Sequence, residues 1–273
     1  ARPTRGAGLV GHARKRDPSI ERSCHVSDQG GCLIAREPRP TAAFRLYCFP
    51  YAGGTSGEFL RWADDLPDVE VLGIVPPGRG ERLGETPFSQ LGELVRTLVE
   101  EVRFQAPFAL FGHSLGATVA FETARVLQAN GRPQPEALFV SGHRPPHLPM
   151  VDEPIHDLPP EQFREIVRDR YPKPPPELAE DEELYAEILE TMRCDLALFE
   201  TYDYRPGPTL DCPIVVASGI DDHWAEADLR PWSRHTKAEC RIHMLEGDLF
   251  FLPKHSDQVI RIIADALRVG TPL

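Results

Sequence analysis

The sequence contains no apolar run long enough to cross a membrane. Its 273 residues are 41% hydrophobic and 26% charged, a balance typical of globular proteins, whereas a bilayer span needs roughly 18 consecutive apolar residues. The basic start of the chain is not followed by the apolar stretch that a secretory signal requires. We therefore expect a cytoplasmic protein with no membrane contact.

Paired cysteines are also lacking. The six cysteines are scattered without the short spacings that zinc sites and disulfide frameworks use. We therefore expect reduced thiols and no bound metal.

Positive charge is scarce outside the first 40 residues. Residues 1–40 hold eight Lys or Arg against four Asp or Glu, the rest of the chain holds 22 against 38, and the net charge is −12. An acidic surface repels nucleic acid and anionic membranes, so neither is expected as a partner. An acidic partner protein would have to meet a local basic patch.

The pattern of the chain changes after its first 40 residues. Residues 1–40 lack periodicity and are rich in Arg, Gly, Pro and Ser, so we expect a disordered basic extension outside the fold. Strands are predicted at 44–49, 69–75, 108–112, 137–141, 213–218 and 241–245, and amphipathic helices at 91–102 and 259–267. This alternation predicts an α/β domain over residues 41–273, with helices on both faces of a mostly parallel sheet.

The alternation of strands and helices stops over residues 144–208. Proline clusters there bracket two helical stretches, at 161–170 and 184–199. An inset between two core strands is well placed to be a helical lid over the C-terminal edge of the sheet, where α/β proteins bind their ligands. A plain packed helical insertion fits the same pattern.

Ser114 is the candidate nucleophile. The run Gly112-His113-Ser114-Leu115-Gly116 directly follows an apolar strand and precedes a helix-forming stretch, which is the context of a nucleophile elbow. Glycines are needed there because the strained serine leaves no room for nearby side chains. A glycine-rich turn with an ordinary serine is the alternative.

Two backbone donors for an oxyanion are expected near the serine. One comes from the small-residue loop 52–54, which follows the first core strand and begins at Ala52. The other is the amide of Leu115, at the positive end of the following helix. The alternative for 52–54 is a simple turn.

An acid partner is expected after a late strand. Asp222 lies three residues beyond Gly219, on the loop that leaves the strand predicted at 213–218, whereas Asp221 is suited to cap the turn. A solvated loop carboxylate is the alternative for Asp222.

Over residues 44–268 the chain resembles the type II thioesterases that accompany modular polyketide and nonribosomal peptide synthases. The blocks that carry the resemblance read CFPYAGG at 48–54, PGRGER at 77–82, GHSLGATVAFETAR at 112–125, MRCD at 192–195 and GIDD at 219–222. The resemblance implies an α/β-hydrolase fold with a lid that shapes an acyl chamber. It also implies an editing hydrolase that clears stalled or mis-primed acyl groups from the phosphopantetheine arms of carrier proteins.

The resemblance also assigns roles by position. It makes Ser114 the nucleophile, Asp222 the triad acid, and Ala52 and Leu115 the oxyanion donors. The partners would be acyl or peptidyl carrier proteins and an acyl thioester, and a monomer is expected. No cofactor is implied, because the oxyanion donors and a good leaving group activate the thioester.

The chain departs from this family at the catalytic base. The family's histidine lies in a block that looks like Gly-Asp-His-Phe-Phe-Leu, whereas residues 247–252 read GDLFFL, so that Leu249 stands at the position expected to be His. Leucine can neither accept the Ser114 proton nor donate it to the leaving thiol. Losing a triad base can cost on the order of 10⁶ in turnover, while binding and the oxyanion donors would leave about 10³ over water.

Other histidines are candidate substitutes for the base, and each is also compatible with a surface or packed role. They are His113, His143, His223 and His255. Three functional hypotheses follow: a thioesterase whose base was exchanged for Leu249, naturally or deliberately; a non-hydrolytic homologue that binds acyl carriers; and a general serine esterase with a rearranged triad. The third fits the carrier-specific blocks least well.

Overall fold

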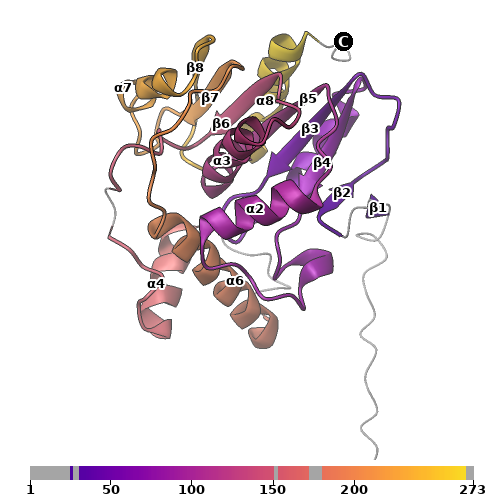
Figure 1. Cartoon of the computed structure of the whole chain (residues 1–273). Helices are drawn as coiled ribbons and strands as arrows, with labels where there is room; N and C mark the ends of the chain where they lie inside the picture. Colours follow the sequence, from indigo (N-terminus) through magenta and orange to yellow (C-terminus); the bar gives the residue numbers. More distant parts are fainter. Residues whose placement is uncertain (1–24, 27–30, 151–152, 172–179, 269–273) are drawn as a thin grey trace, which may run out of the picture.

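The computed structural model describes residues 25–26, 31–150, 153–171 and 180–268. Within these residues one sheet has the strand order β1-β2-β4-β3-β5-β6-β7-β8 (Figure 1). The strands are β1 His25–Val26, β2 Leu33–Ala35, β3 Phe44–Phe49, β4 Val69–Ile74, β5 Phe108–His113, β6 Ala137–Ser141, β7 Ile214–Gly219 and β8 Cys240–Leu245. Neighbouring strands among β3 to β8 pair in parallel. Strand β2 pairs antiparallel with β4, and β1 pairs antiparallel with β2. The predicted α/β class is confirmed.

The sheet extends further toward the N-terminus than the predicted boundary at residue 41. Strand β2 pairs with β4, with Leu33 opposite Ile74, and Cys32 and Leu33 are both only 1% exposed. The prediction that residues 1–40 stay outside the fold is therefore corrected at β1 and β2. These strands are too short to show a period in the sequence. Residues 1–24 and 27–30 of the predicted extension lie outside the described residues.

Helices cover both faces of the sheet, and each face has its own core. Helices α2 (Leu91–Glu101) and α3 (Leu115–Ala129) pack on one face, and α8 (Leu252–Leu267) packs on the other (Figure 1). In α2 the buried residues recur every three or four positions, as the sequence predicts. The predicted closing helix begins earlier than residue 259, because a proline fits its first turn at Leu252-Pro253.

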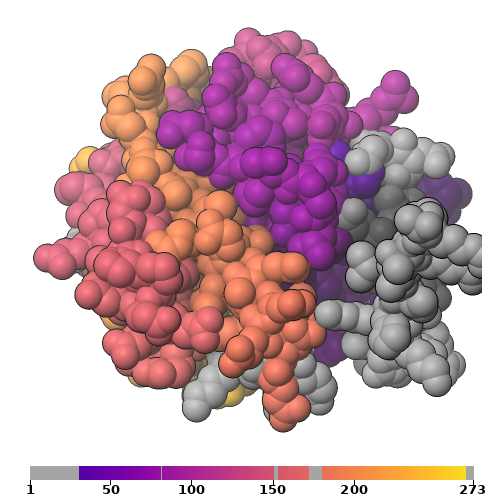
Figure 2. Space-filling view, turned by 90° about the horizontal axis from the view of Figure 1, so that it is seen from below, coloured from indigo at the N-terminus to yellow at the C-terminus, as the bar shows by residue number. Residues whose placement is uncertain are grey.

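The described residues of the inset between β6 and β7 include two helices. They are α4 (Pro160–Arg170) and α6 (Glu182–Glu200), and both lie at one end of the sheet (Figure 1). Figure 2 views the molecule from that end and shows the surfaces of α4 and α6 side by side over a broad part of it. Helix α6 thus lies where it can contact the loops that leave the strands.

The remaining helices are short. They are α1 Gly57–Leu60, η1 Arg61–Asp64, η2 Gly80–Arg82, α7 Glu226–Leu229 and η3 Arg230–His235. Among the described residues, no helix has the length and apolar character that a bilayer crossing requires.

The direction of the strand order changes at the C-terminal ends of β3 and β5. The chain passes from β3 to β4 on one side and then to β5 on the other side of β3, and such a point is where open α/β sheets bind their ligands. Phe49 lies opposite Gly112 at the ends of these strands. Loop 50–54 therefore leaves the sheet next to the turn at Ser114.

Candidate active site

Ser114 lies at a sharp turn between β5 and α3. Its φ of 53° and ψ of −120° are in a region that L residues avoid, at a cost on the order of 1–3 kcal/mol. The Ser114 amide donates to the Ser141 carbonyl at 2.8 Å, and the Ala117 amide donates to the Ser114 carbonyl at 2.9 Å. The backbone geometry is that of the predicted elbow, while the catalytic role of Ser114 stays a prediction.

The two glycines of the elbow are required by close backbone packing. A Cβ atom on Gly112 would lie 2.1 Å from the carbonyl oxygen of Gly116, and one on Gly116 would lie 2.2 Å from the carbonyl oxygen of Phe49. Neither neighbour is a side chain that could move aside. The spacing that suggested an elbow thus has a steric cause in the fold.

The loop that carries the predicted oxyanion donor Ala52 packs against the start of α3, which carries the other predicted donor, Leu115. Gly116 packs against the residues that start loop 50–54, since its Cβ atom would also lie 2.7 Å from the carbonyl oxygen of Pro50. Ala52 is buried within that loop, and Leu115 is the first residue of α3. The positive end of the α3 dipole therefore faces the region where an oxyanion is expected. The donor roles of Ala52 and Leu115 stay predictions.

A buried ion pair from α6 holds this loop in place. Asp195 accepts the Gly53 amide at 2.7 Å through Oδ2 and the Arg79 guanidinium at 2.5 Å through Oδ1. Arg79 also donates to the Gly54 carbonyl at 3.0 Å. Loop 52–54 is thus tied to the inset helix through a carboxylate that the sequence analysis gave no role.

A signal for this residue was present in the sequence. Asp195 lies on the buried stripe of α6, between Met192 and Leu196, and all three are buried. A charged residue on an apolar helical stripe is rarely buried unless it is paired. The partner, Arg79, lies 116 positions earlier, and no helix or strand pattern connects the two.

Asp222 lies on the loop after β7, as expected. It is half-buried, and it accepts the His223 amide at 2.7 Å and the Ser218 hydroxyl at 3.2 Å. Burial raises the pKa of Asp222, and these two hydrogen bonds lower it in part. Asp221 is exposed, and its amide donates to the Gly247 carbonyl at 3.0 Å, while its role in capping the turn stays a prediction.

Leu249 lies beside the residue that precedes the nucleophile. A Cβ atom on Gly142 would lie 2.7 Å from Cδ1 of Leu249 and 2.8 Å from Cε1 of His113. The loop that carries Leu249 also packs on the loop after β7, since a Cβ atom on Gly219 would lie 2.1 Å from the Gly247 carbonyl oxygen. Leu249 therefore lies near His113, and the loop that carries it packs on the end of the strand that leads to Asp222.

His113 is occupied by structural contacts. Its Nδ1 lies 3.0 Å from the Ser141 hydroxyl, and its ring also hydrogen-bonds the backbone of Leu249. Burial lowers the pKa of His113 to about 4, which the bond to Leu249 only partly offsets. These contacts and this lowered pKa favour the packed role for His113 over that of a substitute base.

The other three histidines also have contacts that do not suit a base. The His143 ring meets Phe199 of α6 edge-on, with centroids 5.2 Å apart. Burial lowers the pKa of His143 to about 3, and a base works best when its pKa is near the working pH. His223 is exposed, and His255 faces the Gln258 amide at 3.3 Å. These contacts favour packed or surface roles.

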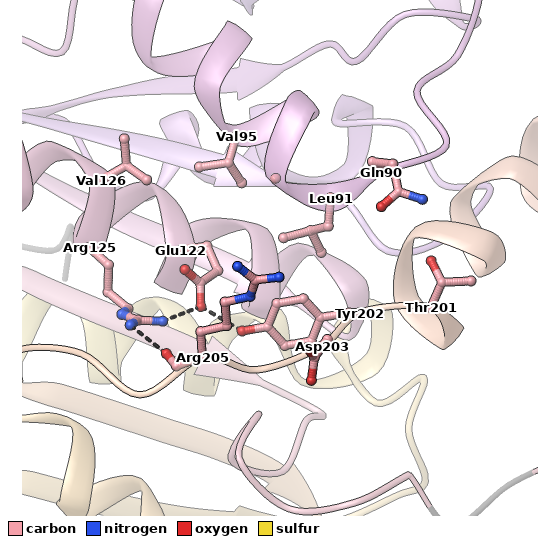
Figure 3. Close-up of a pocket in the computed structure, with 11 residues that line it drawn as sticks. Gln90, Leu91, Val95, Glu122, Arg125, Val126, Thr201, Tyr202, Asp203 and Arg205 are labelled. Carbon is pink, nitrogen blue, oxygen red and sulfur yellow. Dashed lines mark hydrogen bonds and ion pairs between the residues drawn. The ribbon is translucent and has the colours of Figure 1, made fainter.

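A separate pocket of about 390 Å³ lies between the start of α2, the middle of α3 and the segment after α6 (Figure 3). Tyr202 donates to Glu122 at 2.5 Å, and Arg125 bridges Glu122 at 2.7 Å and the Arg205 carbonyl at 2.8 Å. The described residues that line this pocket do not include Ser114. We therefore assign it no part in the acyl chemistry.

Comparisons with known proteins agree on one family. Residues 44–267 match the family described as "Thioesterase domain". The chain is 34% identical to the gramicidin S biosynthesis protein GrsT of Aneurinibacillus migulanus over 248 residues, which is 89% of this chain and 96% of that protein. It is 35% identical to thioesterase PikA5 of Streptomyces venezuelae over 252 residues, 90% of this chain and 89% of that protein.

A solved structure gives the same result for the fold. The type II thioesterase BorB from the borrelidin biosynthetic cluster matches with a TM-score of 0.76 at 35% identity, covering 90% of this chain and 99% of that one.

Proposed function

Because this chain belongs to the thioesterase family, and within it to the type II thioesterases of polyketide and nonribosomal peptide synthase clusters, we propose that it acts on acyl thioesters held on phosphopantetheine arms of carrier proteins. Its part would be to edit or release such acyl groups. The observation that carries this proposal is the strained Ser114 elbow packed against loop 50–54. We also propose a monomer, which sedimentation velocity would check.

The proposed reaction is acyl transfer through Ser114. Its Oγ attacks the thioester carbonyl, the amides of Ala52 and Leu115 bind the oxyanion, and the C–S bond breaks to release the carrier thiol. Water then hydrolyses the acyl-serine and restores the hydroxyl. In this chain, with leucine at position 249, water has to take the serine proton and protonate the leaving thiol, whereas a histidine there, oriented by Asp222, would do both.

We propose that Leu249 slows the proton-transfer steps of this chain. An isobutyl side chain neither accepts nor donates a proton, and it lies beside His113, which is already hydrogen-bonded. Losing a triad base can cost on the order of 10⁶ in turnover. The elbow and the proposed oxyanion donors are unaffected, so binding and a residual rate of about 10³ over water are expected.

We further propose that α4 and α6 form the lid of the acyl chamber. Helix α6 contacts the loops at the C-terminal ends of the strands, because Asp195 binds the Gly53 amide and the Thr191 hydroxyl donates to the Gly78 carbonyl at 3.1 Å. An acyl chain that reaches Ser114 would therefore pass next to α6.

Restoring histidine tests the proposal. The hydrolysis of an acyl-carrier protein is measured for the unmodified chain and for Leu249→His. The substitution is expected to raise the rate by at least about a hundredfold, a fraction of what a triad base contributes. Leu249→Met is the matched control, because methionine conserves volume without an acid–base group. Ser114→Ala added to Leu249→His should remove the gained activity.

Two outcomes would change the assignment. If the unmodified chain hydrolyses as fast as Leu249→His, position 249 is not the base and a rearranged triad operates. If Leu249→His binds the acylated carrier without turnover, the chain is a carrier-binding homologue. The contacts of His113 and His143 argue against the rearranged triad, whereas Leu249 itself is the observation that favours the binding homologue.

A further inference from the structure

The peptide group between Tyr51 and Ala52 carries one proposed oxyanion donor, the Ala52 amide, and hydrogen bonds fix its orientation. The Tyr51 carbonyl, which belongs to the same peptide plane as the Ala52 amide, accepts the Gly54 amide at 2.9 Å. The next amide along the chain, that of Gly53, donates to Asp195 at 2.7 Å. The direction in which the Ala52 amide points is therefore set by contacts of Gly53 and Gly54.

Gly53 and Gly54 are themselves held by side chains from outside the loop. The Arg79 guanidinium donates hydrogen bonds to the Gly54 carbonyl at 3.0 Å and to the Asp195 carboxylate at 2.5 Å. The side chains of Arg79 and Asp195 are only 9% and 5% exposed, so water does not compete strongly with the pair. Asp195 belongs to α6, which makes this ion pair a link between the inset helix and the loop.

The packing of α6 on the loop is tight. Gly53 has a φ of 71°, and a Cβ atom there would lie 3.2 Å from Met192 of α6. A cavity of only about 20 Å³ is lined by Arg79, Asp195 and also Leu115, which leaves room for about one water molecule. The ion pair thus lies close to both proposed oxyanion donors.

We propose that Arg79 and Asp195 are positioning residues for the oxyanion site: they fix the peptide of Ala52 in its donating orientation and make that orientation depend on the place of α6. The inference rests on the proposed function of Ser114. Arg79 has a second effect, because it neutralises a carboxylate that would otherwise oppose a nearby oxyanion. Neither residue touches the reacting atoms in this account.

The test separates binding of the substrate from stabilisation of the transition state. Hydrolysis of an acyl-carrier protein is measured in the full chain with Leu249→His, with and without Asp195→Ala. A donor that acts only on the oxyanion changes kcat and leaves KM nearly unchanged. We expect kcat to fall about ten- to a hundredfold, less than the 10²–10³ seen when a donor is removed outright, with KM within about threefold.

A second measurement uses the same Leu249→His background, in which a base is present to take the Ser114 proton. An alkylboronic acid forms a tetrahedral anionic adduct with a nucleophilic serine, whereas a thioether analogue of the acyl arm imitates the bound substrate. Asp195→Ala is expected to weaken boronic acid binding about tenfold or more and to leave thioether binding nearly unchanged. Asp195→Asn keeps one acceptor for the Gly53 amide and should recover part of the loss.

The controls are chosen to exclude a general structural effect. Glu190→Gln alters an exposed acid of α6 that pairs with Arg193 at 3.9 Å, and should leave kcat unchanged. Arg79→Met combined with Asp195→Leu replaces the buried pair by apolar groups, which proteins tolerate well. If Asp195→Ala does not fold, this double variant takes its place, since it too lacks an acceptor for Gly53. Arg79→Met alone should be slower than the double variant, because it leaves the carboxylate unpaired.

The outcomes distinguish two failures. If Leu249→His alone neither hydrolyses the carrier nor binds the boronic acid, the proposed function is wrong. If it does both, but the Asp195 variants behave like Glu190→Gln or raise KM at constant kcat, the positioning role is wrong and the proposed function stands.

Discussion

The two sides of the predicted triad have the same close packing but different chemistry. On the nucleophile side, Gly112 and Gly116 bring backbone atoms so near that an added Cβ would lie 2.1 and 2.2 Å from a carbonyl oxygen. On the other side, a Cβ atom added to Gly219 would likewise lie 2.1 Å from the Gly247 carbonyl oxygen. The loop of Leu249 is thus held as firmly as the elbow, although its side chain cannot carry a proton.

This comparison separates architecture from chemistry. Backbone packing fixes where residue 249 lies, and the identity of its side chain decides what the site can do. Leucine in place of histidine at this half-buried position keeps all the backbone contacts of the loop. We therefore expect the elbow to tolerate very few changes and position 249 to tolerate many.

The largest effect is expected from Gly112→Ala. The new methyl group would lie 2.1 Å from the Gly116 carbonyl oxygen and 2.6 Å from Cα of Ala117, so α3 would have to shift. We expect a loss of at least about 3 kcal/mol in the free energy of unfolding, at the upper end for overpacking. Urea unfolding followed by circular dichroism measures it.

The matched control for that change is Gly92→Ala. Nothing lies within 4 Å of a Cβ atom at this position in the first turn of α2, so the same substitution should stabilise the protein by roughly 0.5–1 kcal/mol. Equal effects at Gly112 and Gly92 would show that the elbow is not close-packed.

The second largest effect is expected from Gly219→Ala, which lies against the loop that carries Leu249. Gly219→Ala places a methyl group 2.1 Å from the Gly247 carbonyl oxygen and 2.5 Å from that of Asp248, so the loop of residue 249 must move. We expect a loss of about 2–3 kcal/mol in stability. In the Leu249→His background most of the gained hydrolysis should also disappear. A Gly219→Ala chain that keeps the full gain would show that the contact is not needed to place residue 249.

The sequence predicted the parts of this site that are local. Ser114 was found because strand, turn and helix follow one another directly, and the departure at Leu249 was found because its neighbours match a family block. Asp222 lies after β7, where the sequence predicts a loop, and its role as triad acid stays a prediction. Each of these inferences depends on residues within a few positions of one another.

The parts that the sequence did not predict depend on distant contacts. The pair of Arg79 with Asp195 spans 116 positions, and β2 is three residues long, too short for a periodic signal. Glu58 is a third case, because nothing near it in the sequence indicates a buried carboxyl. Such features follow from the topology of the sheet, which brings the loops after β3 and β4 under α6.

The third effect concerns the pH dependence of stability on the nucleophile side. Burial raises the pKa of Glu58 to about 7, with the charge of Arg61 acting in the opposite direction, and its buried Oε1 has no hydrogen-bond partner among the described residues. Between pH 4.5 and about 7 the folded protein keeps a proton that the unfolded chain has released. Stability from this group therefore falls as the pH rises through that window.

Glu58→Gln should remove this dependence. We expect the unfolding free energy at pH 8, relative to that at pH 5, to rise by on the order of 2 kcal/mol compared with the parent chain, since one pKa unit corresponds to about 1.4 kcal/mol. Urea titrations at the two pH values measure it. The same change at exposed Glu93 serves as the control, and identical pH profiles for the two variants would show that Glu58 titrates normally.

The smallest effect is expected from Ser141→Ala, which probes the contact that joins the two sides. His113 lies next to the nucleophile, accepts or donates at Nδ1 with the Ser141 hydroxyl at 3.0 Å, and hydrogen-bonds the backbone of Leu249 through the same ring. Removing the hydroxyl leaves a buried ring nitrogen without a partner, which costs about 1–2 kcal/mol.

Activity measured in the Leu249→His background decides what that bond does. If His113 only packs, Ser141→Ala lowers stability relative to the exposed control Ser233→Ala and leaves the rate per folded molecule unchanged. If His113 also orients the loop of residue 249, the rate falls as well, because a loosened ring no longer fixes the backbone at that position. A change in rate without a change in stability would contradict both, and it would make His113 part of the proton transfer that its contacts now argue against.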